Sequence, residues 1–263
     1  MKWYFKMLIA GVIILIIGIA VTVIVGGVTD WKYGSSIYEY EMKTYQAETE
    51  VDNLKVDFYA GELQIVYGDV ESIKIEYPEN KRYTVKIEKT NDTLSATIGG
   101  RRWYDFIFWR QDYPVTTVTL PRSARLNLNV EMNAGKAKVE GGTYKDVYLK
   151  MNAGELDLGK SKCDLLTCSV NAGKIDLDGA QCNRAILKTN AGEIVADKLD
   201  CPDIEAKINA GNINVEILGN ESDYSIITKI NAGSCNKSDR VGATDKKIQA
   251  EINAGALSVD FSN

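Results

Sequence analysis

The 263-residue sequence contains no histidine, the side chain that proteins use most often as a general base and as a metal ligand. It also lacks a Cys-x-x-Cys pair, a glycine-rich phosphate loop, a nucleophile elbow and a calcium-binding nonapeptide. We therefore expect that the protein is not an enzyme and that it needs no metal ion or cofactor.

Proline is also scarce, and the 31 basic residues are outnumbered by 36 acidic ones. The formal net charge of -5 argues against a nucleic acid as partner, because binding to phosphates requires a basic surface. Four prolines beside 22 glycines suit a chain of many short strands joined by glycine turns. The composition therefore favours an all-β protein.

One tripeptide, Asn-Ala-Gly, occurs seven times. Successive copies are 19 residues apart four times and then 22 residues apart twice, and a period in this range indicates a repeat architecture. The asparagines are Asn133, Asn152, Asn171, Asn190, Asn209, Asn231 and Asn253. The glycines are Gly135, Gly154, Gly173, Gly192, Gly211, Gly233 and Gly255.

Between the tripeptides, apolar and polar residues alternate, so each repeat contains two short, half-buried strands. One apolar column consists of Ala137, Leu156, Ile175 and Ile194, and another of Val147, Leu166, Ala185 and Ile204. A single repeat cannot bury its own apolar face, so the repeats must stack. The pattern predicts a single-stranded β-solenoid, right-handed like a β-helix, with coils of 19–22 residues. A leucine-rich repeat is the alternative, but its Leu-x-x-Leu-x-Leu spacing is missing.

The tripeptide suits the corner of each coil. Glycine adopts positive φ without steric cost, and asparagine tolerates it better than most residues. Stacked in register, the seven asparagines would form a ladder of amide hydrogen bonds. A row of asparagines that binds a polar ligand is the alternative interpretation.

Two further columns follow the same register. Lys136, Glu155, Lys174 and Glu193 alternate in charge, which would stabilise neighbouring coils modestly. Tyr144, Cys163, Cys182 and Cys201 occupy the same position in successive repeats, so the three cysteines form one row. We expect that these three and the other cysteines, Cys168 and Cys235, are core thiols, with one disulfide as the alternative.

The N-terminal part of the chain predicts a membrane anchor. Residues 7–29 carry no charge and are long enough to span a bilayer, while Lys2 and Lys6 precede them and Asp30 follows. We expect a cytoplasmic tail over residues 1–6 and a single-pass protein of the cell membrane with an extracellular C-terminal domain. A cleaved signal peptide is the alternative.

Three regions follow this anchor. Residues 30–50 are expected to form a polar spacer, residues 51–129 a degenerate β-strand and capping region, and residues 130–263 the Asn-Ala-Gly solenoid. Tyr59-Ala60-Gly61 resembles the corner tripeptide with tyrosine in place of asparagine, so we expect the first coil here. The irregular strands around it would cap the stack and protect its edge.

An aromatic stretch and a pair of aspartates are the candidates for function. Trp103, Tyr104, Phe106, Phe108 and Trp109 form either a buried cap or a surface that docks a partner or rests on lipid. Asp157 and Asp176 would lie about 4.8 Å apart on an outer face, a spacing also found in retaining glycosidases. We interpret the two aspartates as part of an ordinary solvated face.

Five features of the sequence together resemble a known family. These features are the N-terminal span, the degenerate strand region, the Leu120-Pro121 step, the segment Arg125-Leu126-Asn127-Leu128-Asn129 and the repeats. They are similar to the bacterial "putative adhesin" β-strand-repeat domains of unknown function, common in Gram-positive membrane proteins, over roughly residues 50–263. The resemblance implies a β-helix displayed outside the membrane, in some members near cell-envelope stress systems. The family has no defined catalytic or binding residues.

From the sequence we therefore expect a non-enzymatic display or interaction module, adhesin-like or accessory to envelope-stress sensing. Its partners would be the membrane, through a single span, and an envelope protein or wall polymer, but no nucleic acid. A wall-polysaccharide enzyme and a cytoplasm-facing scaffold are the alternatives.

Overall fold

The computed structural model describes residues 40–48, 50–79, 83–100 and 115–262. The expected tail over residues 1–6, the expected span over residues 7–29 and the aromatic stretch from Trp103 to Trp109 lie outside these residues. Within the described part, no helix has both the length and the apolar character needed to cross a membrane.

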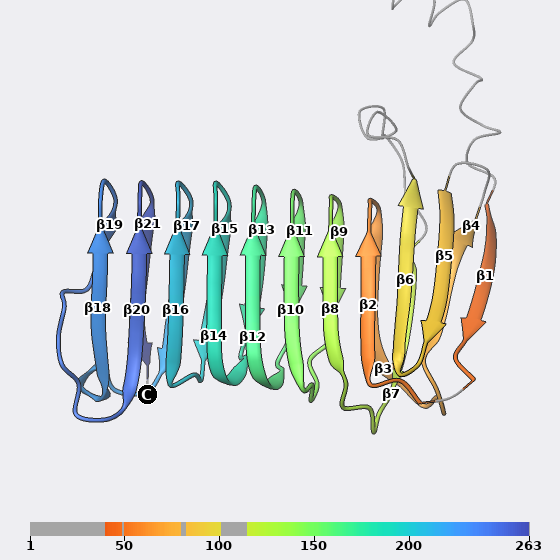
Figure 1. Cartoon of the computed structure of the whole chain (residues 1–263), viewed down its shortest axis with the longest axis horizontal. Coiled ribbons are helices and arrows are strands. Elements are labelled where there is room, and N and C mark those ends of the chain that lie inside the picture. The colour runs from red at the N-terminus through yellow and green to blue at the C-terminus, as the bar shows by residue number, and fades with distance from the viewer. Residues whose placement is uncertain (1–39, 49, 80–82, 101–114, 263) are drawn as a thin grey trace, which may run out of the picture. The chain divides into compact units, whose positions relative to one another are not determined.

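Met42–Asn263 form a compact unit by themselves. Its described strands lie in two sheets, one of 11 and one of 10 strands, as Figure 1 shows. Sheet A contains, in spatial order, β1 (Glu41–Gln46), β4 (Lys74–Glu79), β7 (Thr116–Pro121), β3 (Glu62–Gly68), β9 (Lys136–Val139), β11 (Glu155–Leu158), β13 (Lys174–Asp178), β15 (Glu193–Leu199), β17 (Asn212–Leu218), β21 (Ala256–Ser262) and β19 (Ser234–Cys235).

Sheet B contains, in spatial order, β18 (Tyr224–Ile230), β20 (Lys246–Ile252), β16 (Asp203–Ile208), β14 (Gln181–Thr189), β12 (Lys162–Val170), β10 (Asp146–Met151), β8 (Asn127–Met132), β2 (Asn53–Phe58), β6 (Thr93–Gly100) and β5 (Tyr83–Thr90). A short 3-10 helix, η3 (Glu221–Asp223), precedes β18.

Each regular coil consists of one strand of sheet B, an Asn-Ala-Gly corner and one strand of sheet A. The same position in successive coils pairs in parallel, as Leu149 does with Cys168 in sheet B and Leu156 with Ile175 in sheet A. The chain is therefore an all-β, solenoid-like repeat fold with the expected register. The hand of the winding stays a prediction.

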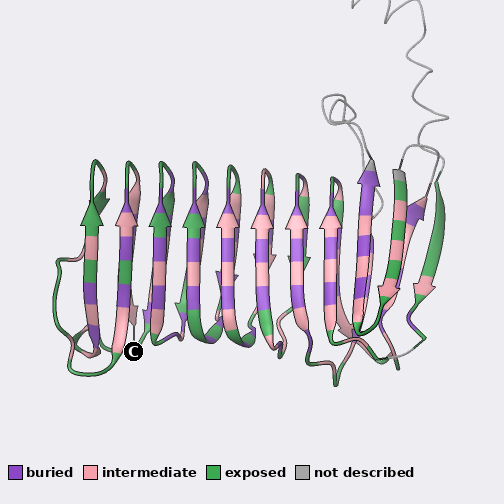
Figure 2. Ribbon diagram, in the orientation of Figure 1, coloured by how far each residue is buried: buried purple, intermediate pink, exposed green. Residues whose placement is uncertain are grey.

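The core lies between the two sheets. Figure 2 shows buried and accessible residues alternating along the strands, as the period-two pattern requires. Leu128, Leu149 and Leu156 are at most 1% exposed, and they belong to columns that run through the stack. A slip of one residue would turn these columns to the solvent, so burial fixes the register.

The order of the coils differs from the order of the chain at the C-terminal end. The last coil, β20–β21, lies between β16–β17 and β18–β19. After Lys246, the inward residues of β20 are apolar, and Ile248 and Ile252 are almost completely buried. By contrast, β18 places Thr228 in an inward column opposite Ala250, and β19 has only two residues. The less apolar and incomplete coil therefore takes the end of the stack.

The N-terminal end is out of order in a similar way. The coil β2–β3, with its corner at Tyr59-Ala60-Gly61, lies between β8–β9 and β6–β7. Strands β5 and β4 then pair antiparallel with β6 and β7, and β1 lies beyond β4. Because β1 falls within residues 30–50, the end of the expected spacer is part of sheet A.

The predicted column of alternating charges and the predicted row of cysteines differ in how far the structure agrees with them. Lys136 contacts Glu155 on the neighbouring coil at 3.6 Å, whereas Lys174 contacts Asp176 on its own strand at 2.7 Å. The expected alternation of ion pairs between coils is therefore only partly realised. All five cysteines are free thiols, and only Cys235, near the C-terminal end of the stack, is more than slightly exposed.

Candidate functional site

The asparagines of the seven corners form one continuous ladder. Each Nδ2 donates to the Oδ1 of the next asparagine at 2.6–2.8 Å, in the order 231, 253, 209, 190, 171, 152 and 133. The order repeats the out-of-order stacking of the coils at the C-terminal end. All the amides point the same way, so each bond polarises the next.

The corner glycines are required for two different reasons. Gly135, Gly154 and Gly173 have positive φ, as expected, but the other four glycines of the repeats are not in that region. At Gly211, a Cβ would lie 2.1 Å from the carbonyl oxygen of Gly192 on the neighbouring coil. Close approach of the backbones therefore requires glycine even where the dihedral angles do not.

The ladder ends at Asn133, because the next corner carries Tyr59 instead of asparagine. Within the described residues, the Nδ2 group of Asn133 has no hydrogen-bond partner, while its Oδ1 accepts from Asn152 at 2.6 Å. On its other side Tyr59 adjoins Gly99, where an added Cβ would lie 2.9 Å from the Cβ of Tyr59. The donor end of the ladder therefore faces a tyrosine that is 40% exposed.

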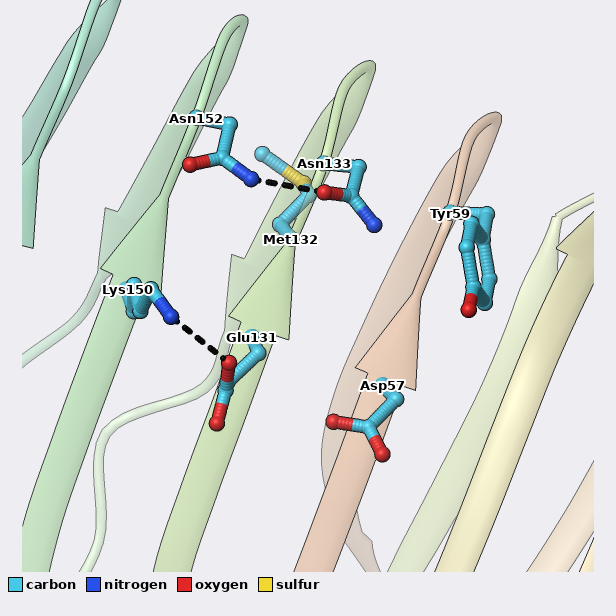
Figure 3. A pocket seen from close by; sticks show the side chains of 7 residues that line it. All are labelled: Asp57, Tyr59, Glu131, Met132, Asn133, Lys150 and Asn152. Carbon is cyan, nitrogen blue, oxygen red and sulfur yellow. Dashed lines mark hydrogen bonds and ion pairs between the residues drawn. The ribbon is translucent and has the colours of Figure 1, made fainter. Parts of the chain in front are cut away.

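A shallow hollow of about 150 Å³ lies at this end of the ladder. Figure 3 shows Tyr59 and Asn133 along its upper side, with the carboxylates of Asp57 and Glu131 below them. The residues that line it are Asp57, Tyr59, Glu131, Met132, Asn133, Lys150 and Asn152, from the neighbouring strands β2, β8 and β10 and the corners that follow them.

Two carboxylates and one ammonium group line the lower part of the hollow. Asp57 and Glu131 pair directly in register across β2 and β8. Glu131 contacts Lys150 at 3.1 Å, and Asp57 contacts Lys55 at 3.4 Å. The hydrogen bond to Glu131 raises the pKa of Lys150, so this lysine stays charged. The hollow thus presents both donors and acceptors, and Lys55 outside the lining offsets the charge of Asp57.

The predicted thiol row is part of the core. Cys163 and Cys182 pair in register and are 5% and 4% exposed. Hydrogen bonds with Cys163 and Cys201, followed by burial, raise the pKa of the Cys182 thiol. The hydrogen bond with Cys182 lowers the pKa of Cys201, but all three thiols of the row are at most 5% exposed, so we interpret the row as a packing feature.

The paired aspartates lie in register on the outer face of sheet A. Burial raises the pKa of Asp157, and the nearby charges of Glu155 and Asp176 raise it further. Lys174 contacts Asp176 at 2.7 Å. Among the described residues, no group of three or more His, Cys, Asp or Glu side chains could hold a metal ion.

Sequence reasoning placed the asparagine and glycine corners but missed the hollow. The aromatic candidates Trp103, Tyr104, Phe106, Phe108 and Trp109 lie outside the described residues. The signal for the hollow was present at Tyr59, the one corner of this type where the asparagine is replaced. Its neighbours Asp57 and Glu131 could not be joined without knowing that β2 pairs with β8.

The profile of the family described as Toastrack DUF4097 matches residues 51–262, which is most of the chain. The chain belongs to this family. The comparison with curated proteins gives no match. The Toastrack match begins just before β2 and ends with β21, so it includes the hollow and the whole ladder.

One solved structure shows the same fold, and two others are less similar. A "putative adhesin" from Bacteroides fragilis NCTC 9343 is 15% identical, with 84% of this chain and 97% of that chain covered and a TM-score of 0.55. A "putative adhesin" from Parabacteroides merdae ATCC 43184 is 17% identical, with coverages of 84% and 96% and a TM-score of 0.45. A "putative lipid binding protein" from Parabacteroides distasonis ATCC 8503 is 14% identical, with coverages of 83% and 96% and a TM-score of 0.47.

Proposed function

We propose that this Toastrack protein is a non-enzymatic binding module, adhesin-like or accessory to envelope-stress sensing, which displays its solenoid outside the cell membrane. The observation that carries the proposal is the regular outer surface of the stack. In-register strands repeat the same side-chain positions from coil to coil, as for Glu155, Lys174 and Glu193 on sheet A. Repeat proteins use extended surfaces of this kind for recognition.

The anchoring is part of the proposal. Residues 7–29 would span the membrane once, with residues 1–6 in the cytoplasm and the described solenoid outside. The partner would be an envelope protein or a wall polymer. A nucleic acid is not expected, because the net charge of -5 opposes phosphate binding.

The location is tested with an epitope tag placed after Asn263. Protease added to intact, wall-stripped cells should remove the tag while a cytosolic control protein survives. If the tag is lost only after the membrane is permeabilised, the solenoid faces the cytoplasm. The scaffold alternative would then replace the proposal.

Binding is tested by sedimentation of the purified full-length protein with wall material. The protein should sediment with purified wall polymer or with an envelope membrane fraction, and an unrelated single-span protein should not. The enzymatic alternative is tested with the double variant Asp157→Asn and Asp176→Asn. Loss of a wall-degrading activity in this variant would contradict the non-enzymatic proposal.

A further inference from the structure

The donor end of the asparagine ladder has no acceptor among the described residues, and Asn133 is exposed, so this donor is open to a ligand. The Nδ2 group of Asn133 follows six hydrogen bonds of the same direction, from Asn231 through Asn253 to Asn152. Cooperative polarisation along such a chain strengthens the last donor. An oxygen atom placed beside Asn133 would therefore accept a stronger bond than one beside an isolated amide.

The lower part of the hollow offers hydrogen-bond acceptors, the carboxylates of Asp57 and Glu131. Asp57 and Glu131 are directly opposite each other across β2 and β8, an arrangement that is unfavourable for like charges. Lys55 and Lys150 each satisfy one side of a carboxylate, at 3.4 and 3.1 Å. The remaining carboxylate lone pairs can accept hydrogen bonds from a ligand.

Tyr59 supplies an aromatic ring beside these polar groups. It is 40% exposed, and Figure 3 shows its ring standing beside Asn133 and above Asp57. The face of an aromatic ring is electron-rich, so it attracts the slightly positive C–H groups of a saturated ring. A site of this kind, an aromatic surface with a few polar groups, fixes both the position and the orientation of a small ligand.

We propose that this hollow binds one sugar ring of a polyhydroxylated glycan. One hydroxyl or acetamido oxygen of the sugar accepts from Asn133, its hydroxyl groups donate to Asp57 and Glu131, and its C–H face lies on Tyr59. An ammonium ligand would satisfy the carboxylates but not the amide donor. A phosphate would satisfy the donor but would meet the two carboxylates. A polyol offers donors and acceptors together.

The inference rests on the proposed function, because it names the ligand class of the same binding module. It is tested on the full-length protein in detergent micelles, labelled with 15N in the asparagine side chains. Chitotetraose, cellotetraose and maltotetraose are added separately, with choline and inorganic phosphate as probes of the other two ligand classes. At least one oligosaccharide should shift the Asn133 amide signal saturably, whereas choline and phosphate should not.

Three variants decide where the oligosaccharide binds. Tyr59→Asn extends the ladder by one amide and removes the ring, so it should keep the fold and weaken binding by about tenfold or more. Asp57→Asn should weaken binding to a similar extent. Glu251→Gln should leave binding unchanged. The ion pair of Glu251 with Lys229 is 3.4 Å long, like that of Asp57 with Lys55, but it lies on another part of sheet B.

The inference is wrong if no oligosaccharide shifts the Asn133 signal, if choline or phosphate shifts it instead, or if Tyr59→Asn binds as well as the unchanged protein. Sedimentation with wall polymer separates these failures from failure of the proposed function. If Tyr59→Asn still sediments with the polymer, the binding module stands and the hollow is not its glycan site. If the unchanged protein neither sediments nor responds to any oligosaccharide, both are wrong.

Discussion

The N-terminal and C-terminal ends of the stack differ in how the two sheets end and in what covers the edge strand. At the N-terminal end, β5, β4 and β1 follow the last coil, and the inward residues Ile73 and Ile75 are 3% and 0% exposed. At the C-terminal end, β18–β19 is the last coil, and the inward residue Ile230 of β18 is 42% exposed.

The difference lies in what covers the edge strand. Antiparallel pairing of β4 and β5 reverses the strand direction, so another parallel coil cannot continue the stack. On β18, Ile226 exchanges backbone hydrogen bonds with Arg240, and Asp239 accepts from the N–H group of Thr228 at 2.8 Å. The antiparallel strands β4 and β5 therefore close the N-terminal end, with β1 outside β4 largely exposed, whereas polar contacts close the C-terminal end beside the partly exposed Ile230.

The largest expected effect compares two positions of one core column, Phe58 inside the stack beside Ile98 and Ile230 on the last coil. Phe58 and Ile230 occupy equivalent inward positions, but Phe58 is 0% exposed. Phe58→Ala should lower the free energy of unfolding by about 3–5 kcal/mol, as in other cores. Ile230→Ala should cost less than about 1 kcal/mol, because Ile230 is already half exposed. Chemical denaturation of the full-length protein measures both values.

If Ile230→Ala were as damaging as Phe58→Ala, Ile230 would have to be covered in solution. The two ends would then be equally closed, and the comparison would fail. A change in the denaturant midpoint without a change in slope is the criterion for a true stability effect.

The second prediction compares the loss of stability on glycine substitution at an interior corner and at a turn near the C-terminal end. Gly154 and Gly219 both have positive φ, at 113° and 138°. An added Cβ at Gly154 would lie 2.1 Å from the Gly135 oxygen, whereas at Gly219 the nearest atom is 3.9 Å away. Gly219→Ala should cost about 1–3 kcal/mol from backbone strain. Gly154→Ala should cost about 1–3 kcal/mol more, because the crowding adds to this strain. Equal losses in thermal melts would show that the coils can move apart.

A smaller effect tests the polar closure through pH. Glu221 contacts Lys237 at 2.7 Å and Arg240 at 3.1 Å, and the hydrogen bond with Lys237, followed by Arg240, lowers its pKa. A lowered carboxyl pKa stabilises the fold above the unfolded pKa, and this contribution is lost as the pH falls through the folded pKa. Glu221→Gln should therefore destabilise the protein at pH 7 by less than about 1 kcal/mol, and by nothing near pH 2.

The control for this prediction is Glu88→Gln near the N-terminal end. Glu88 contacts Lys86 within its own strand at 2.8 Å, with both side chains well exposed. Its loss should change the melting temperature little at either pH. A pH-independent loss for Glu221→Gln would show that packing, not charge, accounts for its role.

The smallest effect has the opposite sign. Burial, Glu155 and Asp176 raise the pKa of Asp157, so its charged form destabilises the stack and stability rises as the pH falls through the folded pKa. Asp157→Asn should therefore raise the unfolding free energy at pH 7 by a few tenths of a kcal/mol, with no gain at low pH. Asp176→Asn should give no such gain, because it removes the contact with Lys174. Melting curves across the pH range compare the two variants.

The repeat made the interior of the fold predictable. The 19-residue spacing of Asn152, Asn171 and Asn190 fixed the register, and the apolar columns fixed which side of each strand is buried. The order at the ends could not be predicted in this way. Repeats of one period can stack in any order, and only exceptions such as Thr228 indicate which coil is terminal.

The hollow could not be predicted from the sequence for a similar reason. Asp57 and Glu131 are far apart in the sequence, and nothing in the spacing of the repeats joins β2 to β8. Tyr59 was visible as an exception to the tripeptide but looked like a weaker copy of it. Its significance depends on its position at the donor end of the ladder, which only the three-dimensional order of the coils reveals.

The out-of-order end is tested most directly by magnetisation transfer between asparagine side-chain amides. Neighbouring strands are about 4.8 Å apart, so amide protons on adjacent rungs give nuclear Overhauser effects and those two rungs apart do not. The structure predicts effects between Asn209 and Asn253 and between Asn253 and Asn231, but none between Asn209 and Asn231. A direct effect between Asn209 and Asn231 would show that the coils stack in chain order and would contradict the account.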